Sequence, residues 1–136
     1  MKVKFTDLSG EFIQLKKALT KIFIRVGKTG QYVLGNELEK FEKNVKKFLK
    51  VKYVIGVGNW TEGMGLVCKA LDLKKNDEII TVSNSFVATC GALAYNNVKP
   101  VLVDVNEDLN INPAKVIKKI KRKTKAIMPV HLSGIP

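Results

Sequence analysis

The sequence predicts an α/β fold: a three-layer α/β/α arrangement with a mostly parallel sheet, preceded by two N-terminal helices. Two observations predict it. Through 1–51, apolar residues recur at three- and four-residue steps, which is typical of amphipathic helices. Through 52–136, short runs rich in Val and Ile alternate with helical stretches, which is typical of a parallel sheet with helices on both faces. We therefore interpret 1–51 as a helical N-terminal segment and 52–136 as the start of an α/β sheet domain.

The N-terminal segment contains two predicted helices separated by glycines. The second helix is expected to begin after Gly35, where Asn36 can cap it and Glu39 can reach back to the cap's amide. Each helix has one apolar stripe, which we interpret as core and not as a binding surface. The stripes are Phe12, Leu15, Leu19, Ile22, Phe23 and Val26 in the first helix, and Leu38, Phe41, Val45, Phe48 and Leu49 in the second.

The second segment has four expected strands and three expected helices. The strands are 53–58, 78–82, 100–105 and 126–131, and the helices are 61–73, 86–97 and 113–121. The sequence stops soon after the fourth strand, before any helix that would cover it. We therefore expect this sequence to be the front part of a longer fold, since an uncovered strand leaves backbone groups unpaired.

Composition excludes several classes of protein. The net charge is +12, but Arg25 and Arg122 are the only arginines among 24 basic residues, and the lysines are not interleaved with aromatic residues. Both features argue against nucleic-acid binding, and we interpret the lysine run 115–125 as a solvated face. Cys68 and Cys90 lie in apolar stretches, without CxxC spacing or a Cys/His cluster, so we expect buried thiols and no metal site.

No targeting or membrane-spanning segment is apparent in the sequence. The N-terminus lacks the apolar stretch of a signal peptide, and no run approaches the 18 apolar residues of a spanning helix. Together with the unpaired cysteines, this predicts a cytoplasmic protein with neither a membrane nor a nucleic acid as its partner.

The candidate site lies where expected strands end and helices begin. Thr61 and Glu62 follow the strand 53–58, and their amides, with the Thr61 hydroxyl, are suited to an anion such as phosphate. Phe86 opens the next helix at the equivalent position, behind Ser85 as the expected cap, and offers a face for an aromatic ligand. The alternatives are that Thr61 merely caps its helix and that Phe86 belongs to the core.

Six motifs, in order and spacing, resemble the DegT/DnrJ/EryC1/StrS family of sugar aminotransferases. They cover nearly the whole chain, and their combination is far more specific than any one of them. The motifs are 30–35 (GQYVLG), 57–62 (VGNWTE), 77–82 (DEIITV), 85–89 (SFVAT), 99–105 (KPVLVDV) and 124–134 (TKAIMPVHLSG).

The resemblance implies the N-terminal portion of the large domain of a fold type I transferase that depends on pyridoxal 5'-phosphate (PLP). Such enzymes move an amino group from a donor such as glutamate to a nucleotide-linked keto sugar, and they work as dimers with active sites at the interface. By position, Thr61 and the amide of Glu62 match the pair that holds the PLP phosphate, and Phe86 matches the aromatic that stacks on its ring. Asp104 and His131 match recurrent positions without an assigned chemical role, and Asp104 is expected to cap a turn.

The chain also departs from the family pattern. Trp60 stands where the family usually has glycine, and Gly63 and Gly65 interrupt the following helix. In the family, the lysine that bonds PLP and the acidic partner of the ring nitrogen lie beyond the point where this sequence ends. We therefore nominate no catalytic residue in this chain and leave open whether it is an enzyme by itself.

Three interpretations follow from these patterns. The first is the front part of a sugar aminotransferase, acting as a homodimer or paired with a C-terminal half. The second is a noncatalytic remnant or interaction module derived from such an enzyme. The third, a generic nucleotide-binding α/β protein, is disfavoured because neither GxGxxG nor GxxxxGK[ST] is present.

Overall fold

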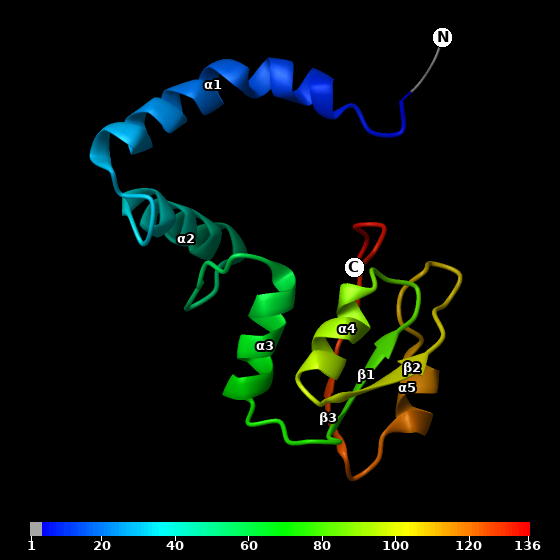
Figure 1. Cartoon of the computed structure of the whole chain (residues 1–136). Helices are drawn as coiled ribbons and strands as arrows, with labels where there is room; N and C mark the ends of the chain where they lie inside the picture. The colour runs from blue at the N-terminus through cyan, green and yellow to red at the C-terminus, as the bar shows by residue number, and fades with distance from the viewer. Residues whose placement is uncertain (1–3) are drawn as a thin grey trace. The chain divides into compact units, whose positions relative to one another are not determined.

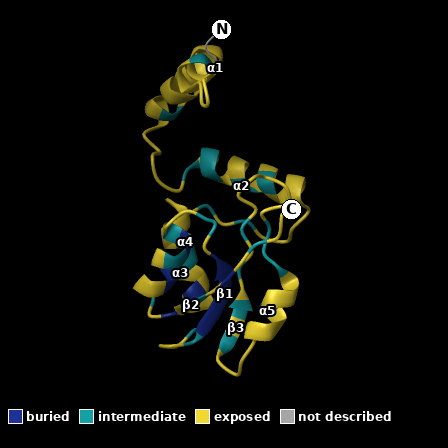
Figure 2. Ribbon diagram, turned by 90° about the vertical axis from the view of Figure 1, so that its right-hand side faces the viewer, coloured by how far each residue is buried: buried dark blue, intermediate teal, exposed yellow. Residues whose placement is uncertain are grey.

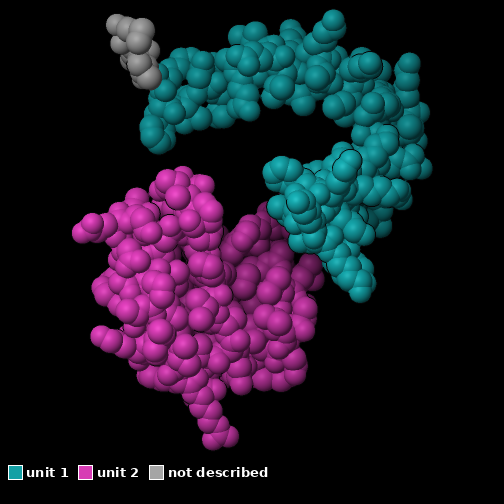
Figure 3. Space-filling model, turned by 180° about the vertical axis from the view of Figure 1, so that it is seen from behind, with its two compact units in different colours: residues 1–56 teal, residues 57–136 magenta. Residues whose placement is uncertain are grey.

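The computed structural model describes residues 4–136 and divides into two compact units, Met1–Gly56 and Val57–Pro136 (Figure 3). Each unit is described by itself. Unit 1 contains helices α1 (Leu8–Thr29) and α2 (Asn36–Leu49). Unit 2 contains α3 (Trp60–Ala70), β1 (Glu78–Val82), α4 (Ala88–Tyr95), β2 (Lys99–Val103), α5 (Pro113–Lys119) and β3 (Thr124–Ile127).

The two helices of unit 1 differ in how their ends are capped. The Asp7 carboxylate accepts a hydrogen bond from the amide of Gly10 at 3.2 Å and caps α1, which ends at Gly30 in the left-handed conformation. Helix α2 has Gly35 as its N-cap and no side-chain cap hydrogen bond. The predicted capping box is therefore wrong: Asn36 is the first helical residue, and the Glu39 side chain does not reach back.

The apolar stripes of unit 1 are not core in this chain. No residue from 4 to 56 is buried, and Phe41 and Phe48 each expose more than half of their surface. The Arg25 guanidinium donates to Glu37 Oε2 at 2.8 Å and joins the two helices by an exposed ion pair. The prediction of two buried stripes is wrong here because unit 1 contains no second apolar layer against which they can pack.

Unit 2 is built on a three-stranded parallel sheet with the order β2-β1-β3 (Figure 1). Ile80 in the central strand lies opposite Val101 on one side and Ile127 on the other. All five residues of β1 are buried, since both edges and both faces of this strand are covered. The predicted parallel sheet is confirmed.

Side chains of β1 alternate between two apolar layers, one on each face of the sheet. Ile79 packs with Cys68 of α3 and Leu93 of α4. Ile80 and Val82 pack with Val116 of α5 on the other face. The buried residues thus concentrate around β1, with helices to either side (Figure 2). This arrangement confirms the predicted α/β/α layering.

The expected strand at 53–58 is absent from the structure, which is the main correction to the predicted elements. The segment forms no ladder in the described chain. The Gly56 amide instead donates to Glu42 Oε1 of α2 at 2.8 Å. A strand needs a hydrogen-bonded neighbour, and residues 4–136 supply none here. The other expected strands are present, although 100–105 and 126–131 are replaced by 99–103 and 124–127.

Candidate functional site

The N-terminus of α3 presents unused hydrogen-bond donors. Asn59 is its cap: the Asn59 Oδ1 atom accepts from the Glu62 amide at 3.0 Å, so the alternative that Thr61 caps the helix is wrong. Among the described residues, the amides of Trp60 and Thr61 and the Thr61 hydroxyl have no hydrogen-bond partner. These groups point to an anion site, because a helix N-terminus combines free N–H groups with a partial positive charge.

Glu62 offers less hydrogen bonding to an anion at the start of α3 than its sequence position predicts. Its amide is already used by the Asn59 cap. Its carboxylate folds back over Gly58, where a Cβ atom added to that glycine would lie 2.9 Å from Glu62 Oε2. The cap role of Asn59 is not among the predictions from the sequence, although an Asn directly before a helix is among the strongest cap signals.

Phe86 lies in the turn between β1 and α4. The residue is 73% exposed, so the alternative that Phe86 belongs to the core is wrong. The Phe86 carbonyl accepts from the Thr89 amide at 2.9 Å and fixes the turn. The expected cap at Ser85 is not formed: α4 begins at Ala88, and the Ser85 hydroxyl instead shares a hydrogen bond with the Thr89 hydroxyl at 2.5 Å.

Helices α3 and α4 pack side by side, and both begin at the end of the sheet where β1 finishes (Figure 1). This topology places Thr61 and Phe86 at the same end of unit 2. The carboxyl end of a parallel sheet is the usual ligand-binding end of an open α/β fold, because helix N-termini converge there.

An apolar groove of about 530 Å³ runs along α3 beside β3 and the residues that follow it. Trp60, Met64, Val67 and Leu71 line it from α3, and Thr89 and His131 lie on its wall. Thr61, Glu62 and Phe86 are not among the residues that line it.

Neighbouring side chains lie close to the two glycines of α3, Gly63 and Gly65. A Cβ atom at Gly63 would lie 3.2 Å from Val57 Cγ2, and one at Gly65 would lie 3.4 Å from Asn96 Nδ2. The Asn96 amide group also donates to the carbonyl of Ala92 at 2.8 Å. Gly63 thus gives room to Val57, which offsets part of the cost of glycine in a helix, about 1 kcal/mol, whereas a Cβ atom at position 65 would make only an ordinary van der Waals contact.

Asp104 and His131, which match family positions without an assigned role, both make polar contacts within the chain. Lys115 Nζ lies 2.6 Å from Asp104 Oδ2 and lowers the pKa of that carboxyl. Asp104 therefore holds a lysine instead of capping a turn. His131 Nδ1 shares a hydrogen bond with Asn110 Oδ1 at 3.0 Å. Of the two cysteines, Cys68 is buried, and this burial raises the pKa of its thiol, whereas Cys90 is half-buried.

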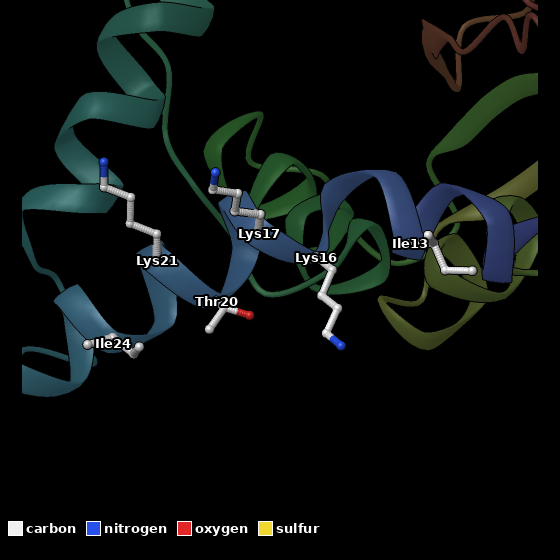
Figure 4. A pocket seen from close by; sticks show the side chains of 6 residues that line it. All are labelled: Ile13, Lys16, Lys17, Thr20, Lys21 and Ile24. Carbon is white, nitrogen blue, oxygen red and sulfur yellow. The ribbon is translucent and has the colours of Figure 1, made fainter.

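A second depression lies on α1 (Figure 4). Its lining consists of Ile13, Lys16, Lys17, Thr20, Lys21 and Ile24. One helix supplies every one of these side chains, and Figure 4 shows them directed to different sides of it. The depression follows α1 from Ile13 to Ile24, and no second element among its lining residues closes it over a ligand.

Residues 4–136 contain neither a candidate metal site nor a candidate membrane span. No group of three or more His, Cys, Asp or Glu side chains is placed to hold a metal ion. None of the described helices combines the length and apolarity needed to cross a membrane.

Comparison with known proteins identifies the family. The model of the DegT/DnrJ/EryC1/StrS aminotransferase family matches residues 14–136. The chain belongs to this family. A curated relative, the dTDP-3-amino-3,6-dideoxy-alpha-D-galactopyranose transaminase of Aneurinibacillus thermoaerophilus, is 38% identical over 134 residues, which are 97% of this chain and 37% of the relative.

Solved structures share the fold of the chain. DesV of S. venezuelae aligns with a TM-score of 0.93 and 32% identity, over 99% of this chain and 37% of DesV. NtdA of Bacillus subtilis, solved with bound cofactor PMP, aligns with a TM-score of 0.84 and 34% identity, over 98% of this chain and 31% of NtdA. The chain thus spans little more than a third of the length of the relatives it matches.

Proposed function

We propose that this chain is the N-terminal part of a PLP-dependent aminotransferase that transfers an amino group from a donor such as glutamate to a nucleotide-linked keto sugar. The similarity to a dTDP-sugar transaminase supports the reaction, and the similarity to NtdA, which binds PMP, the aminated form of PLP, supports the cofactor. The observation that carries the proposal is the open N-terminus of α3 at the same end of unit 2 as the exposed ring of Phe86.

The phosphate of PLP fits the start of α3. The Thr61 hydroxyl and the amides of Trp60 and Thr61 are donors without protein partners in the described chain. A phosphate dianion gains from such donors and from the helix dipole. The amide of Glu62 joins them only if Asn59 gives up its capping hydrogen bond, so we assign the larger share of phosphate binding to Thr61 and the smaller share to Glu62.

The pyridine ring of PLP fits against Phe86. Its exposed ring offers a flat apolar face beside the start of α4. Stacking on this face would hold the cofactor ring in one plane and keep water from that side. When bound, PLP supplies the electron sink for amino transfer, and the residues of this chain hold and orient it. We assign no catalytic lysine within 1–136.

We also propose that the working protein contains a further polypeptide, either a second copy or a C-terminal half. The apolar stripes of α1 and α2 support this, because none of their residues is buried within the described chain. Burial of such stripes in an interface would stabilise unit 1 by the ordinary hydrophobic effect. We expect the assembled protein to act in the cytoplasm.

The proposal can be tested by reconstitution. The chain is mixed with PLP and the C-terminal two thirds or so of the Aneurinibacillus relative, and PLP absorbance, amino transfer and assembly size are measured. We expect PLP absorbance, amino transfer and the assembled size to require both this chain and the C-terminal piece. Thr61→Val removes a hydrogen bond to a charged group and should weaken PLP binding about tenfold or more. Phe86→Ala should weaken it several-fold.

Matched substitutions on unit 1 provide the controls. Thr20→Val on α1 and Phe5→Ala before α1 make the same chemical changes at exposed positions outside the two apolar stripes, and we expect PLP affinity to stay unchanged. A monomer indifferent to the C-terminal piece would instead favour a noncatalytic module. A borohydride-stable PLP adduct at one preferred lysine of the chain alone, located by peptide mass mapping, would contradict the absence of a catalytic lysine.

A further inference from the structure

The segment from Ile117 to Lys123 combines exposed cations with exposed aliphatic side chains at the C-terminal end of α5. We call it the basic segment. Its sequence is IKKIKRK, with five cations in seven residues. Ile117 is 70% exposed and Ile120 is 52% exposed, although isoleucine is among the residues most often buried in folded proteins.

The charge of the basic segment is not neutralised locally. None of its five cations forms an ion pair with another described residue, whereas Lys115, earlier in α5, is paired with Asp104. No Asp or Glu occurs in the sequence from 109 to 136. A concentrated positive potential of this kind attracts an anionic surface.

The backbone of the basic segment is fixed. Lys121 and Thr124 exchange hydrogen bonds, with the Lys121 amide donating to Thr124 Oγ1 and the Thr124 amide donating to the Lys121 carbonyl, both at 2.9 Å. The Glu78 amide of β1 donates to the Lys123 carbonyl at 2.8 Å. The side chains are therefore presented from a turn that is already ordered, which lowers the entropic cost of binding.

Connectivity places this turn at the end of the sheet opposite the proposed cofactor site. Residues 120–123 lead into the amino end of β3, whereas α3 and α4 begin at the carboxyl end of the parallel strands (Figure 1). A surface docked on the basic segment would leave Thr61 and Phe86 accessible to water.

We propose that the basic segment docks unit 2 onto an anionic lipid bilayer, with Ile117 and Ile120 entering the headgroup region and the cations lying against lipid phosphates. Cations flanking exposed aliphatic side chains are typical of peripheral membrane attachment. Nucleic acid fits less well: 109–136 contains no aromatic residue for stacking and only Arg122 for bidentate contacts, and the isoleucines would gain nothing on a polar polyanion. The expectation of no membrane partner rested on the lack of a signal peptide and of a spanning run of apolar residues in the sequence. Neither observation bears on attachment to a membrane surface.

Vesicle sedimentation of the full chain tests this proposal. Vesicles of phosphatidylcholine with about one third phosphatidylglycerol are compared, at physiological salt, with vesicles of phosphatidylcholine alone. We expect binding to the anionic vesicles only. Lys118→Glu with Arg122→Glu should lower the partition coefficient at least about tenfold. Ile117→Ser with Ile120→Ser, which retains every charge, should lower it several-fold.

A charge-matched control distinguishes local docking from general attraction. Lys43→Glu with Lys47→Glu on α2 changes the net charge by the same amount at exposed positions and should bind as the unmodified chain does. Equal losses in the two charge-reversed proteins would overturn the proposal, as would unchanged binding of the isoleucine variant. So would tighter binding to duplex or single-stranded DNA than to anionic vesicles. Unchanged Trp60 fluorescence checks the fold of unit 2 in the variants of the basic segment, and unchanged helical circular dichroism checks α2 in the control variant.

Discussion

Units 1 and 2 carry the same sequence signal with opposite structural results. Both contain helices with many apolar residues, which form regular stripes in unit 1. In unit 2 the apolar residues of α3, α4 and α5 meet a sheet, and residues such as Leu93 and Val116 are buried. In unit 1 no residue from 4 to 56 is buried. An apolar stripe therefore predicts that a helix needs a partner, and it becomes core only where the same chain provides one.

The largest expected effect concerns a buried leucine of unit 2. Leu93 has no exposed surface, and Leu93→Ala should lower the free energy of unfolding by about 2–5 kcal/mol because it leaves a cavity against β1. Trp60 is the only tryptophan and lies in α3, so its fluorescence during urea unfolding reports on unit 2.

Leu19→Ala is the matched substitution in unit 1. Leu19 is 48% exposed on α1, and leucine and alanine have similar helix propensities. We expect the Trp60 unfolding midpoint to stay unchanged. If Leu19→Ala shifted that midpoint as much as Leu93→Ala, the distinction between a self-sufficient unit 2 and a partner-dependent unit 1 would be wrong.

A smaller effect is expected at the helix caps. Asn59→Ala removes the cap of α3 and should destabilise unit 2 by about 1 kcal/mol, as measured by Trp60 fluorescence in urea. Asp7→Ala removes the cap of α1 and should fray that helix, which lowers helical circular dichroism without moving the Trp60 midpoint. Equal shifts of the midpoint would show that the two units unfold together.

The smallest expected effect on stability comes from the ion pair between Lys115 and Asp104. The Lys115 ammonium holds the pKa of Asp104 below its ordinary value of 3.8, so the folded state favours the ionised carboxyl. The resulting stability is present above that ordinary value and is lost as pH falls through the lowered pKa. The effect should be slight because both side chains are exposed to screening solvent. Lys115→Met should raise the carbon-13 titration midpoint of Asp104, and an unmoved midpoint would contradict the ion pair.

Much of unit 2 was predictable because its signals are local. The β1 strand was predicted with its observed bounds, since Ile79 to Val82 form a short apolar run between a polar turn and a serine-rich turn. The start of α5 followed from Asn112-Pro113, where the Asn112 side chain accepts from the Lys115 amide. Such signals depend on a few neighbouring residues.

The incorrect predictions concern features that are set by residues distant in sequence or by competition between possible helix caps. The strand expected at 53–58 needs a neighbour that residues 4–136 do not supply, and Gly56 is tied to Glu42 instead. At the candidate site, the positions of Thr61 and Phe86 followed from the order of elements. The Asn59 hydrogen bond that occupies the Glu62 amide did not, because Asn59 and Thr61, two residues apart, compete as caps of the same helix.

A crystal structure of the chain assembled with a C-terminal piece and PLP tests the central claim most directly. The account predicts that Thr61 Oγ1 lies within hydrogen-bond distance of the PLP phosphate, about 2.7 Å, and that the Phe86 ring stacks on the pyridine ring. PLP bound elsewhere, with Thr61 and Phe86 pointing away from a common hollow, would contradict the account.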